Sequence, residues 1–246
     1  MATKERKSRF FEYEERIRKS YLELKKAYAE VQDSYAEMVF RLALVAEYKD
    51  DSTGTHLVRI ADYSTEIARA MNLSAKDVNY LKYASVMHDI GKLVVPDAIL
   101  KKPSGLTPEE REVIKKHAAL GANIFKGSRS PLLKVAKLIA LTHHERYDGT
   151  GYPSGLKGKD IPLFGRIVAL ADVFDALTSQ RPYKEAYGFD EAVEMVRVES
   201  GKHFDPDVVK VFLKCKNKIR EIWQATKDID AFVKDKANEQ RIEDQG

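Results

Sequence analysis

Histidines that stand beside carboxylates and beside one another are the residues of this chain best suited to metal chemistry. The chain has 6 histidines, and two of them, His143 and His144, are adjacent. A third belongs to the run His88-Asp89-Ile90-Gly91-Lys92. Imidazole nitrogens mixed with carboxylate oxygens suit Fe, Mn, Zn or Ni better than Ca or Mg. These runs therefore predict a metal-dependent hydrolase.

Two neighbouring features support a metal site, because an isolated His-Asp pair is more often structural. Asp172 lies in the apolar stretch Ile167-Val168-Ala169-Leu170-Ala171-Asp172-Val173-Phe174. A carboxylate in such a helix is costly to bury without a cation, although a salt bridge is the alternative partner. A glycine- and proline-rich loop, HHERYDGTGYPSG, begins at the adjacent histidines. Its glycines allow close backbone approach, and Pro153 stiffens the turn.

The elements that must position these residues are expected to be helices. Apolar residues recur at three and four positions, and strand-like alternation is nearly absent, so the fold class is all-α. Ser74, Thr107 and Asp205 are expected helix N-caps, with Glu110 completing a capping box. Helices are expected at 55–71, from Ser74 to about 88–92, from Thr107, from Pro131 to His144, at 166–178 and from about Asp205 to Lys236.

The N-terminal stretch has an unbroken heptad pattern, which predicts a long helix that forms a parallel, dimeric coiled coil. A single long helix packed on its own domain is the alternative. We expect an N-terminal coiled-coil or signalling helix at 1–46, a catalytic domain at 47–236 and a frayed tail at 237–246. The apolar seam alternates spacings of four and three through Ile17, Tyr21, Leu24, Tyr28, Val31, Tyr35, Met38, Leu42 and Val45.

Composition excludes several classes of protein. The chain has no run of 18 apolar residues, so no membrane span is predicted. Its single cysteine, Cys215, rules out an internal disulfide, which fits a reducing cytoplasm. The formal net charge is +4, and the basic residues are spread along the chain, which argues against a nucleic-acid-binding domain.

The motifs resemble the HD-GYP family, a branch of the HD-domain metal phosphohydrolases, over roughly Leu42 to Leu213. The resemblance implies an all-α HD-domain helical bundle with a buried di-metal centre that hydrolyses cyclic di-GMP. It rests on His88-Asp89-Ile90-Gly91-Lys92, His143-His144-Glu145-Arg146, Tyr147-Asp148-Gly149-Thr150-Gly151-Tyr152-Pro153, Ala171-Asp172-Val173-Phe174-Asp175-Ala176-Leu177-Thr178-Ser179 and Arg181-Pro182-Tyr183-Lys184.

The resemblance also implies how two metal ions, most consistent with Fe or Mn, would be held. A bridging Asp89 and a bridging hydroxide would leave each ion an open position for phosphate oxygens. Some family members bind a third ion through a glutamate four residues before the first histidine, where this chain has Ser52. We therefore expect two ions and doubt complete hydrolysis to GMP. The implied ligands are His56, His88, Asp89 and Asp172 for one ion, and Asp89, His117, His143 and His144 for the other.

The remaining roles follow from the same resemblance. Lys92 would act with Asp89 in catalysis, stabilising developing charge or the leaving group. Arg181 and Lys184 would bind phosphate or guanine, and Asp175 would either support a metal ligand or accept from guanine. Tyr152 would contribute to substrate binding from a loop that shapes the substrate mouth, or the loop would dock a partner such as a cyclase domain. His203 is expected to be structural.

Three functions remain open at this point. The leading one is a phosphodiesterase that converts cyclic di-GMP to linear pGpG. The second is a non-catalytic sensor that binds cyclic di-GMP or protein partners. The third is a phosphatase, or a phosphodiesterase that acts on other nucleotides, including mixed or other cyclic dinucleotides. The N-terminal helix would carry input from an upstream sensory domain in a homodimer.

Overall fold

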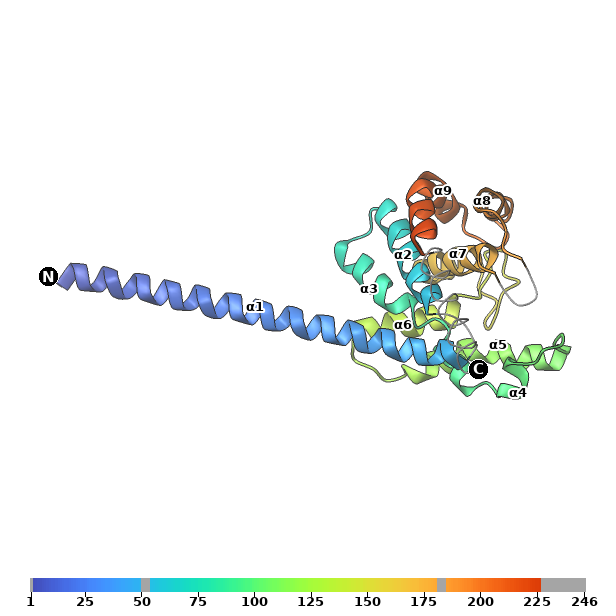
Figure 1. The fold of residues 1–246 in the computed structure, drawn as a ribbon, viewed down its shortest axis with the longest axis horizontal. Coiled ribbons are helices and arrows are strands. Elements are labelled where there is room, and N and C mark those ends of the chain that lie inside the picture. Colours follow the sequence, from blue (N-terminus) through green and yellow to red (C-terminus); the bar gives the residue numbers. More distant parts are fainter. Residues whose placement is uncertain (1, 50–53, 181–184, 227–246) are drawn as a thin grey trace, which may run out of the picture. The chain divides into compact units, whose positions relative to one another are not determined.

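The structure is a computed structural model that describes residues 2–49, 54–180 and 185–226 (Figure 1). Every named element in this part of the chain is a helix, and none is a strand. The all-α fold class predicted from the sequence is therefore confirmed. Among the helices described, none combines the length and apolar character needed to span a lipid bilayer.

The chain divides into two compact units, residues 1–41 and residues 42–246. Helix α1 (Ala2–Lys49) supplies the described part of the first unit and continues into the second. The second unit thus begins somewhat before residue 47, and the boundaries 47 and 236 remain predictions. The tail at 237–246 lies outside the described residues.

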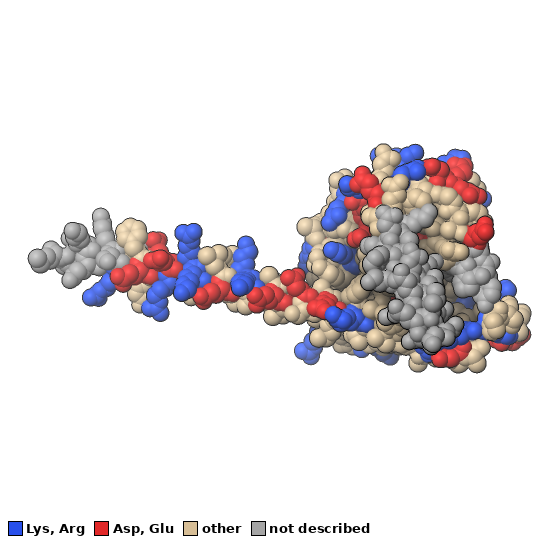
Figure 2. All heavy atoms as spheres, in the orientation of Figure 1, with Lys and Arg blue, Asp and Glu red and all other residues tan. Residues whose placement is uncertain are grey.

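Helix α1 exposes the whole apolar seam. Its side chains, from Ile17 to Val45, are between 37% and 69% exposed. Both basic and acidic side chains lie along the same helix (Figure 2). Within the second unit, the last turns of α1 have two different faces. Leu42 and Val45 are exposed, whereas Ala43, Ala46 and Glu47 are buried.

Local capping signals set where several helices of the second unit begin. Ser74 accepts a hydrogen bond from Asp77 N, and Thr107 and Glu110 form a complete capping box. Asp205 accepts from Asp207 N. These three predicted caps are confirmed. The helices are α2 (Thr55–Ala70), α3 (Ala75–Ser85), η1 (Ile90–Val94), α4 (Asp97–Leu100), α5 (Pro108–Ile124), α6 (Pro131–Thr142), η2 (Gly158–Asp160), α7 (Leu163–Thr178), α8 (Phe189–Val198) and α9 (Pro206–Lys214).

One predicted helix end and the continuity of another predicted helix are wrong. Helix α3 ends at Ser85, before the His-Asp motif, and the chain then tightens into turns and the 3₁₀ helix η1. Here Lys92 N donates to Asp89 O at 2.9 Å, an i−3 bond typical of this tighter helix. The helix expected from Asp205 to Lys236 breaks at Cys215 and resumes over 216–226, and residues beyond 226 are not described.

The close approach of η1 to α5 explains the glycine of the His-Asp motif. A Cβ added at Gly91 would lie 2.0 Å from the carbonyl oxygen of His117 and 2.5 Å from Gly121 N. Real Cβ atoms do not approach backbone this closely. Glycine at this position therefore lets His88 and Asp89 sit beside the helix that carries His117.

The core of the second unit forms around α2, α6 and α7. Helix α2 packs against α3, α7 and α9, and α6 packs against α3, α5 and α7. Fully buried apolar side chains fill these contacts, including Ile60 and Ile67 on α2 and Leu170 and Phe174 on α7. This packing brings α2, the segment after α3, α5, α6 and α7 together, and these five parts of the chain carry the predicted ligands.

Candidate metal centre

The seven predicted metal ligands come together in two groups. His56 lies in the first turn of α2, His88 and Asp89 lie between α3 and η1, and His117 lies on α5. His143 is the C-cap of α6 and His144 follows it, so this helix ends slightly before the predicted His144, and Asp172 lies on α7. In each group, one ligand atom from every residue lies within 4.8 Å of all the others. The groups are Asp89, His117, His143 and His144, and then His56, His88 and Asp172.

Asp89 lies between the two groups, with one carboxylate oxygen toward each. Its Oδ1 is 3.1 Å from His117 Nε2 and 3.4 Å from His143 Nε2. Its Oδ2 is 3.4 Å from His88 Nε2 and 2.7 Å from Lys92 Nζ. In the other group, His56 Nε2 and His88 Nε2 are each 3.9 Å from Asp172 Oδ1. This arrangement suits a carboxylate that bridges two cations.

Hydrogen bonds at Nδ1 orient four of the five imidazoles. His88 Nδ1 lies 2.8 Å from Ser85 O, His117 Nδ1 lies 2.6 Å from Ile114 O, and His143 Nδ1 lies 3.1 Å from Ile139 O. His56 Nδ1 lies 2.6 Å from a carboxylate oxygen of Asp175. Because each acceptor holds the proton on Nδ1, the lone pair of Nε2 is directed into the site.

The site fits divalent cations on the evidence of its own atoms. Among the described residues, the buried His88 Nε2 and Asp89 Oδ1 have no hydrogen-bond partner. Buried polar atoms without partners are costly, so these two are candidates for coordination. Two ligands that bind one ion at about 2.1 Å lie about 3 Å apart. The Asp89 oxygens lie 3.1 to 3.4 Å from the Nε2 atoms of His88, His117 and His143, close to that separation.

The electrostatics of the site keep Asp89 ionised. Burial alone would raise the pKa of Asp89. The charges of Lys92 and His88, with the His117 and His143 rings close to Asp89 Oδ1, outweigh burial and hold this pKa well below its usual value. Burial likewise disfavours the charged form of His88, but the charges of Asp89 and Asp172 raise its pKa to about 9. Asp89 is therefore an ionised carboxylate, which is the form that binds a cation.

The loop after His144 is fastened by a buried carboxylate that sequence reasoning missed. Glu145, 1% exposed, accepts hydrogen bonds from Ser154 N at 2.8 Å and Leu156 N at 3.0 Å. A Cβ added at Gly151 would lie 2.3 Å from Arg146 N, so glycine lets the loop close onto the backbone that follows His144. Tyr152 then stacks on the His144 ring, with centroids 4.7 Å apart.

Two more buried residues beside the site were also missed. Arg59 contacts Asp175 and Ser179, with its Nη2 donating to Ser179 Oγ at 3.0 Å. Glu47 is 2% exposed, and its charge adds to larger effects that outweigh burial and raise the two histidine pKa values, those of Asp175 on His56 and of Asp89 and Asp172 on His88. The partners of Arg59, Asp175 and Ser179, are distant in sequence. The i, i+3 spacing of Arg59 from His56 was the one available signal.

The remaining predicted site residues lie in different surroundings, and two of them are not described. Asp175 is buried, and both its oxygens contact His56 or Arg59, an environment that favours support of a metal ligand over contact with guanine. Arg181 and Lys184 lie outside the described residues. His203 stacks on Phe204, and burial lowers its pKa to about 4.

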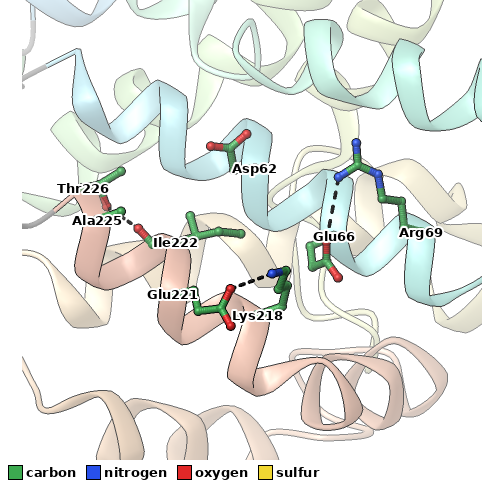
Figure 3. Close-up of a pocket in the computed structure, with 8 residues that line it drawn as sticks. All are labelled: Asp62, Glu66, Arg69, Lys218, Glu221, Ile222, Ala225 and Thr226. Atoms are coloured by element: carbon green, nitrogen blue, oxygen red, sulfur yellow. Dashed lines mark hydrogen bonds and ion pairs between the residues drawn. The ribbon is translucent and has the colours of Figure 1, made fainter.

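A separate hollow of about 370 Å³ lies between α2 and the helical residues 216–226 (Figure 3). The close-up shows two ion pairs on its wall, between Lys218 and Glu221 and between Arg69 and Glu66. None of the predicted site residues belongs to it. Its lining consists of Asp62, Glu66, Arg69, Lys218, Glu221, Ile222, Ala225 and Thr226.

Comparison with known proteins agrees with this site. A family model described as an HD domain matches residues 13–208. A cyclic di-GMP phosphodiesterase of Thermotoga maritima is 46% identical over 189 residues, which cover 77% of this chain and 51% of the relative. A 3′3′-cGAMP-specific phosphodiesterase of Vibrio cholerae is 42% identical over 176 residues, covering 72% and 34%. The chain thus spans about half the length, or less, of these relatives.

A solved structure supports the fold alone. The crystal structure of a cyclic GMP-AMP-specific phosphodiesterase of Vibrio cholerae has a TM-score of 0.57 and 21% identity, and the match covers 78% of this chain and 52% of that one. The family match extends over most of the chain and includes all seven predicted ligands. The chain therefore belongs to the HD-domain family, and its His-Asp and Gly-Tyr-Pro motifs place it in the HD-GYP branch.

Proposed function

We propose that this protein is a metal-dependent phosphodiesterase that hydrolyses cyclic di-GMP to linear pGpG. The observation that carries the proposal is the position of Asp89, which faces histidines of both groups at 3.1 to 3.4 Å. A carboxylate shared by two cation sites suits phosphodiester hydrolysis. The Thermotoga maritima relative, named a cyclic di-GMP phosphodiesterase, supports the substrate.

The centre we propose holds two ions, Fe or Mn, with Asp89 as the shared ligand. When bound, such ions would activate water and neutralise the phosphate oxygens. The two groups of side chains, each able to hold one ion, support this number. Ser52, which stands where some family members have a third-ion glutamate, lies outside the described residues.

Several side chains of this chain would position and neutralise the substrate. Lys92 Nζ lies 2.7 Å from Asp89 Oδ2, where its charge could stabilise a phosphate oxygen or the leaving group. Tyr152 presents a half-buried ring beside His144, and Lys115 Nζ lies 5.6 Å from the centre of that ring. A flat aromatic ring with a nearby cation suits a purine and its phosphate. Arg181 and Lys184 are proposed to bind phosphate or guanine.

Of the two alternative functions, one is supported by the relatives and the other is disfavoured by the site. The Vibrio cholerae relatives named 3′3′-cGAMP-specific phosphodiesterases favour a mixed cyclic dinucleotide as the alternative substrate. A non-catalytic sensor is disfavoured because the chain has kept all seven side chains of the two groups.

A panel of cyclic dinucleotides separates these functions. Manganese- or iron-loaded protein is incubated with cyclic di-GMP, 3′3′-cGAMP and cyclic di-AMP, and the products are resolved by chromatography. We expect cyclic di-GMP to be consumed fastest, with pGpG accumulating rather than GMP. Faster loss of 3′3′-cGAMP would support the alternative substrate. Binding without any product would support the sensor.

We also propose that the seam of α1 forms a parallel coiled coil with a second copy of the chain. The spacing of four and three follows a coiled-coil repeat, and the seam side chains are largely exposed. Within the second unit, Lys49 of the same helix donates to Leu93 O and Val95 O, both at 2.6 Å. Rotation of α1 in a dimer would therefore move the segment that follows Lys92. Such a movement would give an upstream sensory domain a way to alter the site.

Truncation of the chain to begin at Met38 is expected to weaken self-association and change turnover while leaving the metal content unchanged. The physical reason is loss of most of the seam without loss of any predicted ligand. Sedimentation of full-length and truncated chains tests it. Leu24→Glu should dissociate the dimer, whereas Leu22→Glu, an exposed residue outside the seam, should not. A full-length chain that stays monomeric at tens of micromolar would contradict the coiled coil.

A further inference from the structure

His56 differs from the other oriented ligands in what holds its ring. His88, His117 and His143 have backbone carbonyl oxygens within hydrogen-bonding distance of Nδ1. Nδ1 of His56 instead lies 2.6 Å from the Asp175 carboxylate. A side-chain carboxylate can rotate, whereas a helical carbonyl is fixed by the helix. The orientation of His56 therefore depends on whatever fixes Asp175.

Arg59 is the residue that fixes Asp175. Its Nε contacts Asp175 Oδ1, and its Nη2 donates to Asp175 Oδ2 at 3.2 Å. The same Nη2 donates to Ser179 Oγ at 3.0 Å, and Ser179 Oγ lies 3.3 Å from Asp175 Oδ2. Arg59 and Asp175 are both buried, at 5% and 1% exposure. A two-point contact of this kind fixes the plane of a carboxylate as well as its position.

The network also joins the two helices that deliver ligands to one group. Arg59 is one turn after His56 on α2, and Asp175 is one turn after Asp172 on α7. Each ligand therefore shares a helix face with one member of the Arg59–Asp175 pair. The pair thus sets the separation of His56 and Asp172 at the same time as the rotation of the His56 ring.

We propose that Arg59 is a positioning residue for the ion held by His56, His88 and Asp172, and that it acts through Asp175. This inference rests on the metal centre of the proposed function and deepens it. Arg59 holds the Asp175 carboxylate, Asp175 accepts the Nδ1 proton of His56, and His56 Nε2 remains directed toward the ion. Loss of such an outer partner typically costs about 10- to 100-fold in metal affinity.

A salt bridge that only joins α2 to α7 is the competing explanation. It predicts that removal of Arg59 lowers the stability of the whole domain and affects both groups of ligands or neither. A positioning role predicts a selective effect on one group. The two explanations therefore differ in metal affinity rather than in folding.

Manganese binding to the metal-stripped full chain, measured by competition with a chelator, tests the role of Arg59. Arg59→Gln is expected to weaken binding of one ion by about 10- to 100-fold and to leave the other unchanged. The matched control is Arg69→Gln on the same helix, since the Arg69 side chain is 63% exposed and pairs with Glu66 at 3.8 Å. Should Arg59→Gln not fold, Arg59→Lys keeps the charge, loses the two-point contact and is expected to show the same selectivity.

A double-mutant cycle shows whether Arg59 acts through His56. In a His56→Ala background, Arg59→Gln should cause no further loss of manganese affinity, because the ring that it positions is gone. Additive losses would overturn the proposal, as would equal weakening of both ions or unchanged binding in Arg59→Gln. No nucleotide is present in this measurement, so an error in the proposed substrate would leave its result unaffected.

Discussion

Replacement of Asp89 by alanine is expected to abolish turnover and reduce the metal content to one ion per chain or fewer. Asp89 is the residue whose two oxygens face both groups of histidines, so its loss removes a donor from each proposed ion at once. The fall in kcat should exceed the roughly 10²- to 10³-fold loss typical of removing a single transition-state donor. Elemental analysis of anaerobically purified protein and a turnover assay measure the two effects.

The control for Asp89 is Asp97→Ala, which removes an exposed carboxylate paired with Lys49 at 3.4 Å. This variant should keep the wild-type metal content and rate. Wild-type protein is expected to contain two ions per chain, so a value close to three would contradict the two-ion centre. An Asp89→Ala protein that retains both ions would show that Asp89 is not the shared ligand.

Replacement of Lys92 by alanine is expected to lower kcat by about 10²-fold or more while both ions remain bound. Lys92 reaches the site from η1, where its Nζ lies 2.7 Å from Asp89 Oδ2. No predicted ligand is removed by the change, but the positive charge closest to the shared carboxylate is lost. The measurement is single-turnover hydrolysis of the nucleotide that the panel identifies, with metal content determined on the same samples.

The metal content decides between two roles for Lys92. A lysine that only balances the charge of Asp89 would, when removed, weaken metal binding and leave the metal-saturated rate unchanged. A lysine that stabilises developing charge would affect the saturated rate. Lys126→Ala, an exposed position that follows α5, provides the matched loss of one positive charge. Full activity of Lys92→Ala would contradict the catalytic role.

Local sequence signals predicted the secondary structure well where a single residue determines a helix start. Ser74, Thr107 and Asp205 each cap a helix because their side chains satisfy amides two or three residues later. The end of α3 was not predictable in this way. The turns and the 3₁₀ helix that follow it bring the Gly91 backbone close to His117 on a distant helix, and that contact is visible only in three dimensions.

The same distinction applies to the site. Short motifs and their resemblance to a family were enough to name the seven side chains that the fold gathers into two groups. Their supports were not predicted, because each bonds a partner that no local motif of the sequence contains. Arg59 meets Asp175 from another helix, and Glu145 bonds the backbone of residues 154 and 156, whose side chains carry no signal.

The Nδ1 contacts of the ligand histidines have a consequence for how this centre can evolve. Ser85, Ile114 and Ile139 contribute their carbonyl oxygens, which every amino acid carries, so substitution of these side chains leaves the acceptors in place. Mutation of these partner residues therefore leaves the Nδ1 hydrogen bonds of three imidazoles in place. His56 alone among the four relies on a replaceable acceptor, Asp175. Mutational tuning of metal affinity should consequently concentrate at the His56 end of the centre, and directed-evolution libraries aimed at a different metal preference should recover changes there first.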